Sequence, residues 1–225
     1  MFAHRRHDGR GSAGTGRESS ELAEYADVLP PGTSDAWTRL VGVVPAAAYL
    51  AGGTALAIHL RHRVSRDLGF FTEASFDAEE LARLLTDRFD DFSMTRVDDG
   101  TVDGLLGSTK VQFLDASSQV NLVAPTPLAG LRVASVEDIL AMKLKVIMDR
   151  GELRDYFDLM CVEKQTDLDA VIGVRLYLDR YCPDVPDQHL YQIVKAIGYL
   201  DDVDDDPGVP ASKAELARYW AMRQP

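Results

Sequence analysis

A glycine pair precedes a lone aspartate by about a dozen residues in the segment YLAGGTALAIHLRHRVSRDLGFFT, residues 49–72. Gly52 and Gly53 separate a short apolar run from a helix-like one, an arrangement that can aim backbone N–H groups and a positive helix end at phosphate. Thr54 would add a hydroxyl group. Asp67 follows where a returning strand could hold Mg²⁺ against the same phosphates. This layout suits nucleotidyl transfer, although a glycine pair between a strand and a helix is also a common simple turn.

The residues around this aspartate leave several alternatives open. Ser65 lies two positions before it, so in an extended segment both side chains point to one face, and the hydroxyl could contact phosphate or cap a turn. Arg63 and Arg66 could attract RNA phosphates or pair with the protein's own acids. His59 and His62 have a spacing that can chelate zinc, but no third ligand is evident, which favours a solvated basic face.

A second set of basic residues lies on a predicted helix that begins at Val136. Lys143 and Arg150 are seven residues apart, about two turns, and therefore share a face, whereas Lys145 lies about 200° around from Lys143. Lys143 could hold triphosphate oxygens as a compact charge, with Arg150 as support. A solvated basic stripe on an ordinary helix would have the same spacing.

The segment RGELRDYFDLM also permits two interpretations. Arg154 and Asp158 have i,i+4 spacing, which can give a helix-surface ion pair of about 0.2 to 0.5 kcal/mol. Asp155 falls in the first helical turn, where an acid stabilises the helix dipole without any further function. In the functional interpretation, Asp158 accepts a proton from an attacking hydroxyl or orients that hydroxyl.

Taken together, these motifs resemble those of the AbiEii/MenT nucleotidyltransferase toxins, a branch of the DNA polymerase beta-like superfamily. That family has Gly-Gly-Thr-Ala-Leu followed by His-Arg-x-Ser-x-Asp-Leu-Asp-Phe-Phe, then a lysine-containing helix and Arg-Asp-x-x-Asp. The resemblance covers roughly residues 46 to 163. In the first motif the matching residues are Gly52, Gly53, Thr54, Ala55, Leu56, His62, Arg63, Ser65, Asp67, Leu68, Phe70 and Phe71.

The resemblance implies transfer of a nucleotide from NTP to RNA with Mg²⁺ as cofactor. MenT-type members add pyrimidine nucleotides to the 3′ end of tRNA and so stop translation, and a cognate antitoxin restrains them in cytoplasmic bacterial two-gene modules. The implied catalytic residues are Asp67, which also binds the metal, Lys143, Asp155 and Asp158. The implied nucleotide-binding residues are Gly52, Gly53, Thr54, Arg63, Ser65, Lys143, Arg150 and Arg154.

The chain departs from the family pattern at Gly69, where the second aspartate of Asp-x-Asp is expected. Loss of one oriented charge contact can cost on the order of 10² to 10³ in rate. On the later strand KVQFLD, Gln112 stands where a third acid is expected, and Asp115 points to the opposite face by strand alternation. An alternative function is therefore a catalytically impaired module that binds a nucleotide or a partner.

Composition narrows the class of protein. The chain has 225 residues, 46% of them hydrophobic, which is enough for one substantial core or two small ones. Its net charge of −12 argues against general binding to nucleic acid, which requires many Lys and Arg residues. The charge is uneven, however, because five acids gather in residues 201–206 while residues 59–66 contain three arginines and no acid. A basic cleft could still bind RNA.

The expected location is the cytoplasm, without membrane contact. No run approaches the roughly 18 to 20 apolar residues of a membrane span, and the N-terminus lacks a secretory signal. Cys161 and Cys182 have no metal-binding spacing, so reduced thiols are expected.

Several elements must position the site. Residues 1–20, rich in Gly, Arg and Ser, are predicted to form a disordered arm. Ser34 is predicted to cap a helix over DAWTRLVGVV. The pattern then predicts strand, helix, strand and amphipathic helix in AAAYLAG, GTALAIHLRHR, DLGFFT and FDAEELARLLTDRF, the last with Leu81, Leu84, Leu85 and Phe89 on its apolar stripe. Hairpin-connected strands are predicted in FSMTRV, TVDGLLG, KVQFLD and QVNLV.

The remaining chain is predicted to be helical. Ser135 should cap the helix that contains Lys143, in a variant capping box with Asp138. Further helices are expected at about 153–163, 168–182, 187–200 and 212–223. The segregation of strands and helices predicts an α+β fold with a nucleotidyltransferase-like domain over residues 21–130 and a helical domain over residues 131–225 that contributes Lys, Arg and Asp to the cleft.

Overall fold

The computed structural model describes residues 14–223 and has the predicted α+β fold. The strands are β1 (Ala48–Ala51), β2 (Leu68–Thr72), β3 (Phe92–Asp98), β4 (Thr101–Leu106), β5 (Thr109–Asp115), β6 (Thr126–Leu128) and β7 (Leu131–Val133). The helices are α1 (Gly14–Ala23), α2 (Pro31–Leu40), α3 (Gly52–Leu60), α4 (Ala78–Arg88), α5 (Val136–Arg150), α6 (Leu153–Gln165), α7 (Ala170–Tyr181), α8 (Pro186–Gly198) and α9 (Lys213–Ala221).

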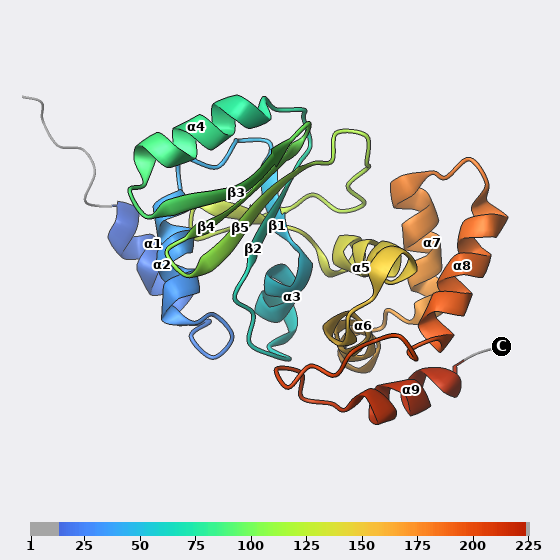
Figure 1. The fold of residues 1–225 in the computed structure, drawn as a ribbon. Helices are drawn as coiled ribbons and strands as arrows, with labels where there is room; N and C mark the ends of the chain where they lie inside the picture. Colours follow the sequence, from blue (N-terminus) through green and yellow to red (C-terminus); the bar gives the residue numbers. More distant parts are fainter. Residues whose placement is uncertain (1–13, 224–225) are drawn as a thin grey trace, which may run out of the picture.

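One mixed sheet, in the order β3-β4-β5-β2-β1-β7-β6, forms one side of the molecule, and α5 to α9 gather on the other side (Figure 1). β2 runs antiparallel to β1 and parallel to β5, and its register pairs Gly69 with both Ala51 and Gln112. Because side chains alternate between the faces of a strand, Gly69 and Gln112 share one face. Phe70 and Phe113 stack on the other, buried face with their ring centroids 5.1 Å apart.

Helices pack on the sheet where the sequence places apolar stripes. Asp77 caps α4 by accepting the Glu80 N–H, and the helix packs on β3 and β4. Leu84 does not join the buried stripe as predicted, because its side chain points outward and remains 48% exposed. α3 contacts β1 and β2 as well as α5 and α6, so it connects the sheet to the helices. Both cysteines are free, as expected.

Two predictions for the N-terminal segment are wrong where the structure describes it. Residues 14–20 of the predicted arm belong to α1, while residues 1–13 lie outside the described part of the chain. α1 is attached to the rest of the molecule, because Leu22 is buried in the core and the Glu21 carboxylate accepts the Ala129 N–H at 2.7 Å. α2 begins at Pro31 rather than after Ser34, because proline suits the first helical turn, where its missing N–H would have had no partner.

The segment QVNLV is not a strand. The Asp138 carboxylate accepts the N–H groups of Leu122 and Val123, each at 3.0 Å, and Arg180 donates to the Val120 carbonyl at 3.1 Å. These buried side chains satisfy the backbone groups that a sheet neighbour would otherwise bind. Arg180 also bonds Asp138 and, at 2.7 Å, the Tyr49 hydroxyl, so it connects β1, α5 and α7.

The sheet instead gains β6 and β7, which the sequence did not indicate. β7 runs parallel to β1 and antiparallel to β6, so the sheet extends past the proposed domain boundary at residue 130. That boundary stays a prediction. Ser135 caps α5 as predicted by accepting the Asp138 N–H at 3.1 Å, and the four later helices lie where they were expected. Between residues 14 and 223, none of the helices has the length and apolar character to traverse a bilayer.

Candidate functional site

The turn between β1 and α3 forms one wall of a cavity of about 410 Å³. Gly52 has φ +71, a backbone conformation that favours glycine. The first N–H groups of any helix lack intrahelical partners, and among the described residues α3 has no side-chain cap to bind them. The predicted residues that line this cavity are Gly52, Gly53, Thr54, Arg63, Ser65, Asp67, Lys143 and Arg154.

Thr54 and Ser65 bind each other across the base of the turn. Thr54 is 1% exposed, and its hydroxyl lies 2.7 Å from the Ser65 hydroxyl and also donates to the Asp67 carbonyl. The Ser65 N–H donates to the Val28 carbonyl at 3.0 Å. These bonds hold the segment before β2 beside the start of α3. Both hydroxyls therefore act on the protein's own groups in this structure, and they place Asp67 next to the glycine turn.

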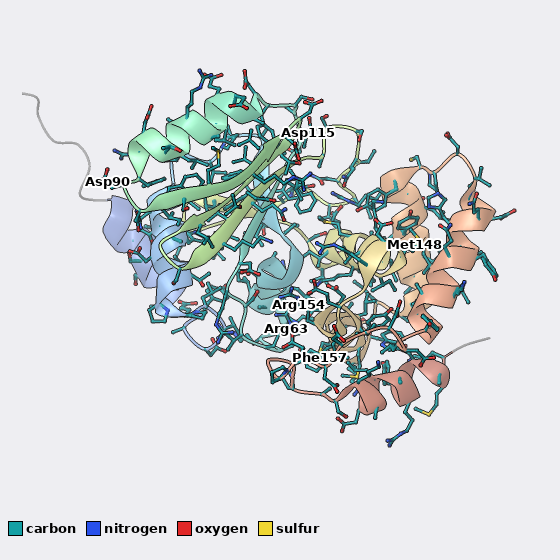
Figure 2. The ribbon with its side chains drawn as sticks, viewed as in Figure 1. Arg63, Asp90, Asp115, Met148, Arg154 and Phe157 are labelled. Carbon is teal, nitrogen blue, oxygen red and sulfur yellow. The ribbon has the colours of Figure 1, made fainter. Side chains whose placement is uncertain are left out.

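A buried cluster of charges lies next to the glycine turn, because a Cβ on Gly53 would come within 2.5 Å of an Arg63 guanidinium nitrogen. Arg63 and Arg154 are labelled in Figure 2, and both line the cavity. Arg63 donates to both carboxylate oxygens of Asp158, at 2.6 and 2.8 Å. Lys143 contacts Asp158 at 2.6 Å and Asp155 at 2.7 Å. The Asp155 carboxylate also accepts the Glu152 N–H at 3.0 Å, as the third residue of α6. One face of the cluster therefore presents two cations to the cavity.

The cluster fixes the ionisation of its members. Burial opposes the charged form of Asp158, but the Lys143 charge and hydrogen bonds from Arg63 and His62 hold the pKa of this carboxyl far below its usual range. Burial likewise opposes the charge of Lys143, yet Asp158 and Asp155 raise the pKa of its ammonium. The two carboxylates therefore favour the charged form of Lys143, which also lines the cavity.

Asp158 does not line the cavity, and its side chain is fully buried. The predicted pair with Arg154 is absent among the described ion pairs, because Asp158 faces inward while Arg154 pairs with Glu152. The predicted solvated face is wrong for His62. Its ring is buried, stacks on Phe157 and places Nε2 2.8 Å from an Asp158 oxygen.

Arg150 does not reach the cavity. It shares a helical face with Lys143, as predicted, but two turns place it about 10 Å further along the axis. Its side chain is 83% exposed and lies 3.8 Å from Glu152. Lys145 points away as predicted, because its partly exposed side chain pairs with Asp149 at 3.3 Å. The seven-residue spacing therefore predicted the face of the helix but not the position along it.

The oxygen ligands available to Mg²⁺ come from few residues. Asp67 is exposed and lines the cavity, and Gly69 and Gln112 lie on the same wall. Asp115 lies at the far end of the sheet, away from Arg63 (Figure 2), and its carboxylate accepts the Ser117 N–H at 2.7 Å. No group of three or more metal-binding side chains exists within residues 14–223. One carboxylate nevertheless fits Mg²⁺ that arrives with nucleotide phosphates, because Mg²⁺ commonly takes one or two protein carboxylates in such sites.

Sequence reasoning missed one part of the cavity. Asp206, Gly208 and Val209, from the loop between α8 and α9, complete its lining. The unusual acidic run over residues 201–206 was the available signal, but no local pattern indicated that it lines the same cavity as the glycine turn.

Comparisons with known proteins found a matching family model and a sequence relative. The family model described as "Nucleotidyl transferase AbiEii toxin, Type IV TA system" matches residues 44–119 and 111–207. An uncharacterized Aquifex aeolicus (strain VF5) protein, aq_aa25, is 30% identical over 162 residues, 70% of this chain and 76% of that protein.

Two solved structures have a similar fold. MenT4, a nucleotidyltransferase toxin from Mycobacterium tuberculosis, has a TM-score of 0.56 at 19% identity, covering 96% of this chain and 88% of that one. JHP933 from Helicobacter pylori has a TM-score of 0.50 at 17% identity, covering 94% and 90%.

Proposed function

The chain belongs to the AbiEii family of nucleotidyltransferase toxins, and we propose that it moves a pyrimidine nucleotide from NTP to the 3′ end of tRNA and so blocks translation. The observation that supports this most is the cavity in which a glycine turn, Asp67 and several cations meet. NTP and tRNA are the substrates of this proposal, a cognate antitoxin is the partner, and the cytoplasm, where both substrates occur, is the location.

The polyphosphate is held by backbone amides and cations that line one cavity. Backbone N–H groups at Gly52 and Gly53 and the positive end of α3 face it. Lys143, Arg154 and Arg63, the last next to Gly53, add positive charge to the same cavity. Lys143 and Arg63 are pre-positioned, because Asp155 and Asp158 hold them before any ligand arrives. Such fixed charges stabilise a phosphoryl transition state without reorganisation.

Asp67 is the residue that would hold Mg²⁺, with NTP oxygens and water as the other ligands. When bound, the ion neutralises charge on the transferring phosphate. Thr54 and Ser65 keep Asp67 in place through its backbone. In the transfer, the acceptor hydroxyl oxygen bonds to the α-phosphorus while the bond to the β-phosphate oxygen breaks, so pyrophosphate leaves and the hydroxyl proton passes to solvent.

Asp155 and Asp158 act as positioning residues in this scheme. Both oxygens of Asp158 are bound by cations, and those of Asp155 are bound by Lys143 and the Glu152 N–H. An acid that is fully buried and held ionised cannot reach an acceptor hydroxyl, so Asp158 is better suited to orienting Arg63 and Lys143.

A transfer assay tests the function. Each of the four NTPs, labelled on the α-phosphate, is incubated with total tRNA, Mg²⁺ and the protein. We expect label on tRNA from a pyrimidine NTP, and its loss in Asp67→Ala. Asp115→Ala, which removes an acid outside the cavity, should keep the activity. Label that persists in Asp67→Ala, or that appears on protein instead of tRNA, would contradict the proposal.

Gly69 favours one alternative, a catalytically impaired module that binds a nucleotide or a partner. A Cβ at this position would have the Ala51 carbonyl, at 4.0 Å, as its nearest neighbour, so a side chain can begin here without a clash at its first carbon. If the unaltered protein is inert and Gly69→Asp labels tRNA while Gly69→Asn does not, the alternative holds. If the protein is active, Gly69→Asp should still raise the rate, by up to about 10².

A further inference from the structure

A second carboxylate reaches the cavity from the far end of the chain. Asp206 lies 139 positions after Asp67 in the sequence, yet both residues line the same cavity. Although burial opposes it, the pKa of Arg63 is raised by Asp158 first and more weakly by Asp155 and Asp206. The Asp206 charge therefore acts on a cation that we assign to the polyphosphate.

The loop that carries Asp206 is anchored at several points. Val203 and Val209 are buried on either side of it. Lys213 donates to the Asp201 carbonyl at 2.8 Å, and the Gly208 N–H donates to one Asp206 carboxylate oxygen at 2.8 Å. That bond uses one of the two carboxylate oxygens and fixes the direction of the group. Asp206 is therefore a built part of the cavity wall.

A fixed carboxylate beside a polyphosphate is unfavourable unless a cation lies between them. The repulsion between two anions becomes attraction once a divalent ion bridges them. Asp67 meets the same condition in the same cavity, so one bridging cation would explain both acids. The neighbouring acids Asp204 and Asp205 do not line this cavity, so their charges do not require a bridging cation.

The position that lacks a carboxylate is Gly69 on β2, two residues after Asp67, which lies just before the strand; both residues line the cavity. We propose that Asp206 supplies the second protein carboxylate to the Mg²⁺ ion that enters with the triphosphate, in place of the side chain that residue 69 lacks. Mg²⁺ keeps several waters, so Asp206 can contact the ion directly or through one of them. The inference rests on the proposed function, because it assumes a polyphosphate in the cavity.

The test measures metal binding without any transfer. Mn²⁺ accepts the same oxygen ligands as Mg²⁺ and is followed by electron paramagnetic resonance. The folded protein is titrated with Mn²⁺ in the presence of inorganic tripolyphosphate, which does not depend on the base. Asp206→Asn keeps an oxygen for the Gly208 N–H, so the loop should remain in place. Asp205→Asn is the matched control, because it removes the same charge from the neighbouring position.

We expect Asp206→Asn to weaken Mn²⁺ binding by about tenfold or more and Asp205→Asn to change it less than about twofold. Adding Gly69→Asp to Asp206→Asn should restore the affinity, because the cavity again has two carboxylates. Equal effects of the two loop variants would overturn the inference and leave the proposed function intact. Failure of the unaltered protein to bind tripolyphosphate at all would overturn both.

Discussion

Arg63 and Asp158 form a two-point ion pair between the segment after α3 and the middle of α6, with N–O distances of 2.6 and 2.8 Å. The Asp158 side chain is fully buried, and Lys143 from α5 shares the same carboxylate. One acid therefore holds three elements together and orients two of the cations assigned to the nucleotide.

Removal of this acid should destabilise the fold. Asp158→Ala leaves the buried Arg63 guanidinium without its carboxylate and Lys143 with Asp155 alone. Breaking a buried ion pair in this way typically costs about 3 to 5 kcal/mol. Urea denaturation monitored by circular dichroism measures the free energy of unfolding. Asp149→Ala, which breaks the exposed pair with Lys145, should cost no more than about 1 kcal/mol. Similar losses in the two variants would show that the Asp158 cluster is not structural.

Acid should weaken the protein through the same carboxyl. The pKa of Asp158 is lowered in the folded state, so its stabilising contribution is complete above the unfolded value of about 3.9 and is lost as pH falls below it. We expect the free energy of unfolding to fall more steeply between about pH 5 and pH 2 in the unaltered protein than in Asp158→Asn. Parallel curves for the two proteins would contradict the role of Asp158 in acid unfolding.

The second glycine of the turn should not tolerate a side chain. A Cβ on Gly53 would lie 2.5 Å from an Arg63 guanidinium nitrogen that Asp158 holds in place. Gly53→Ala should therefore displace Arg63 and weaken tripolyphosphate binding, as measured by calorimetry. Gly69→Ala is the control, because it adds the same methyl group to the same cavity where space is open. Equal binding by the two variants would mean that Arg63 does not hold phosphate.

Arg154 and Arg150 should differ although both pair with Glu152. Only Arg154 lines the cavity, so Arg154→Ala should raise the KM for NTP by about tenfold, the loss expected for one charge-assisted hydrogen bond. Arg150→Ala should leave this KM unchanged. Steady-state kinetics with saturating tRNA separates the two, and an equal rise in KM would place Arg150 at the nucleotide after all.

The sequence predicted those parts of the site that depend on local periodicity. The strand, glycine turn and helix around Gly52, and the face of α5 that carries Lys143, follow from spacing within one or two elements. The prediction of a strand in QVNLV was wrong for the opposite reason. Backbone groups of this segment are bound by Asp138 and Arg180, which lie further along the chain. Neither side chain could be assigned to that segment by a local pattern.

The position of single side chains along and across elements was equally hard to predict. The i,i+4 spacing of Arg154 and Asp158 suited an ion pair on the helix surface. In the structure, α3 packs against α6, and the Asp158 side chain faces Arg63 instead. Asp206 joins the cavity through the path of a loop without regular structure. In each case the decisive partner lies far away in the sequence.

Arg180 reaches from α7 to the Tyr49 hydroxyl on β1 and to Asp138 on α5, and its side chain is fully shielded from water. If the chain were divided between the sheet and the helices, the helical fragment would contain Arg180 without Tyr49. The sheet fragment would contain Tyr49 without Arg180. Neither fragment should be viable alone, and heating should melt the entire molecule in one cooperative step.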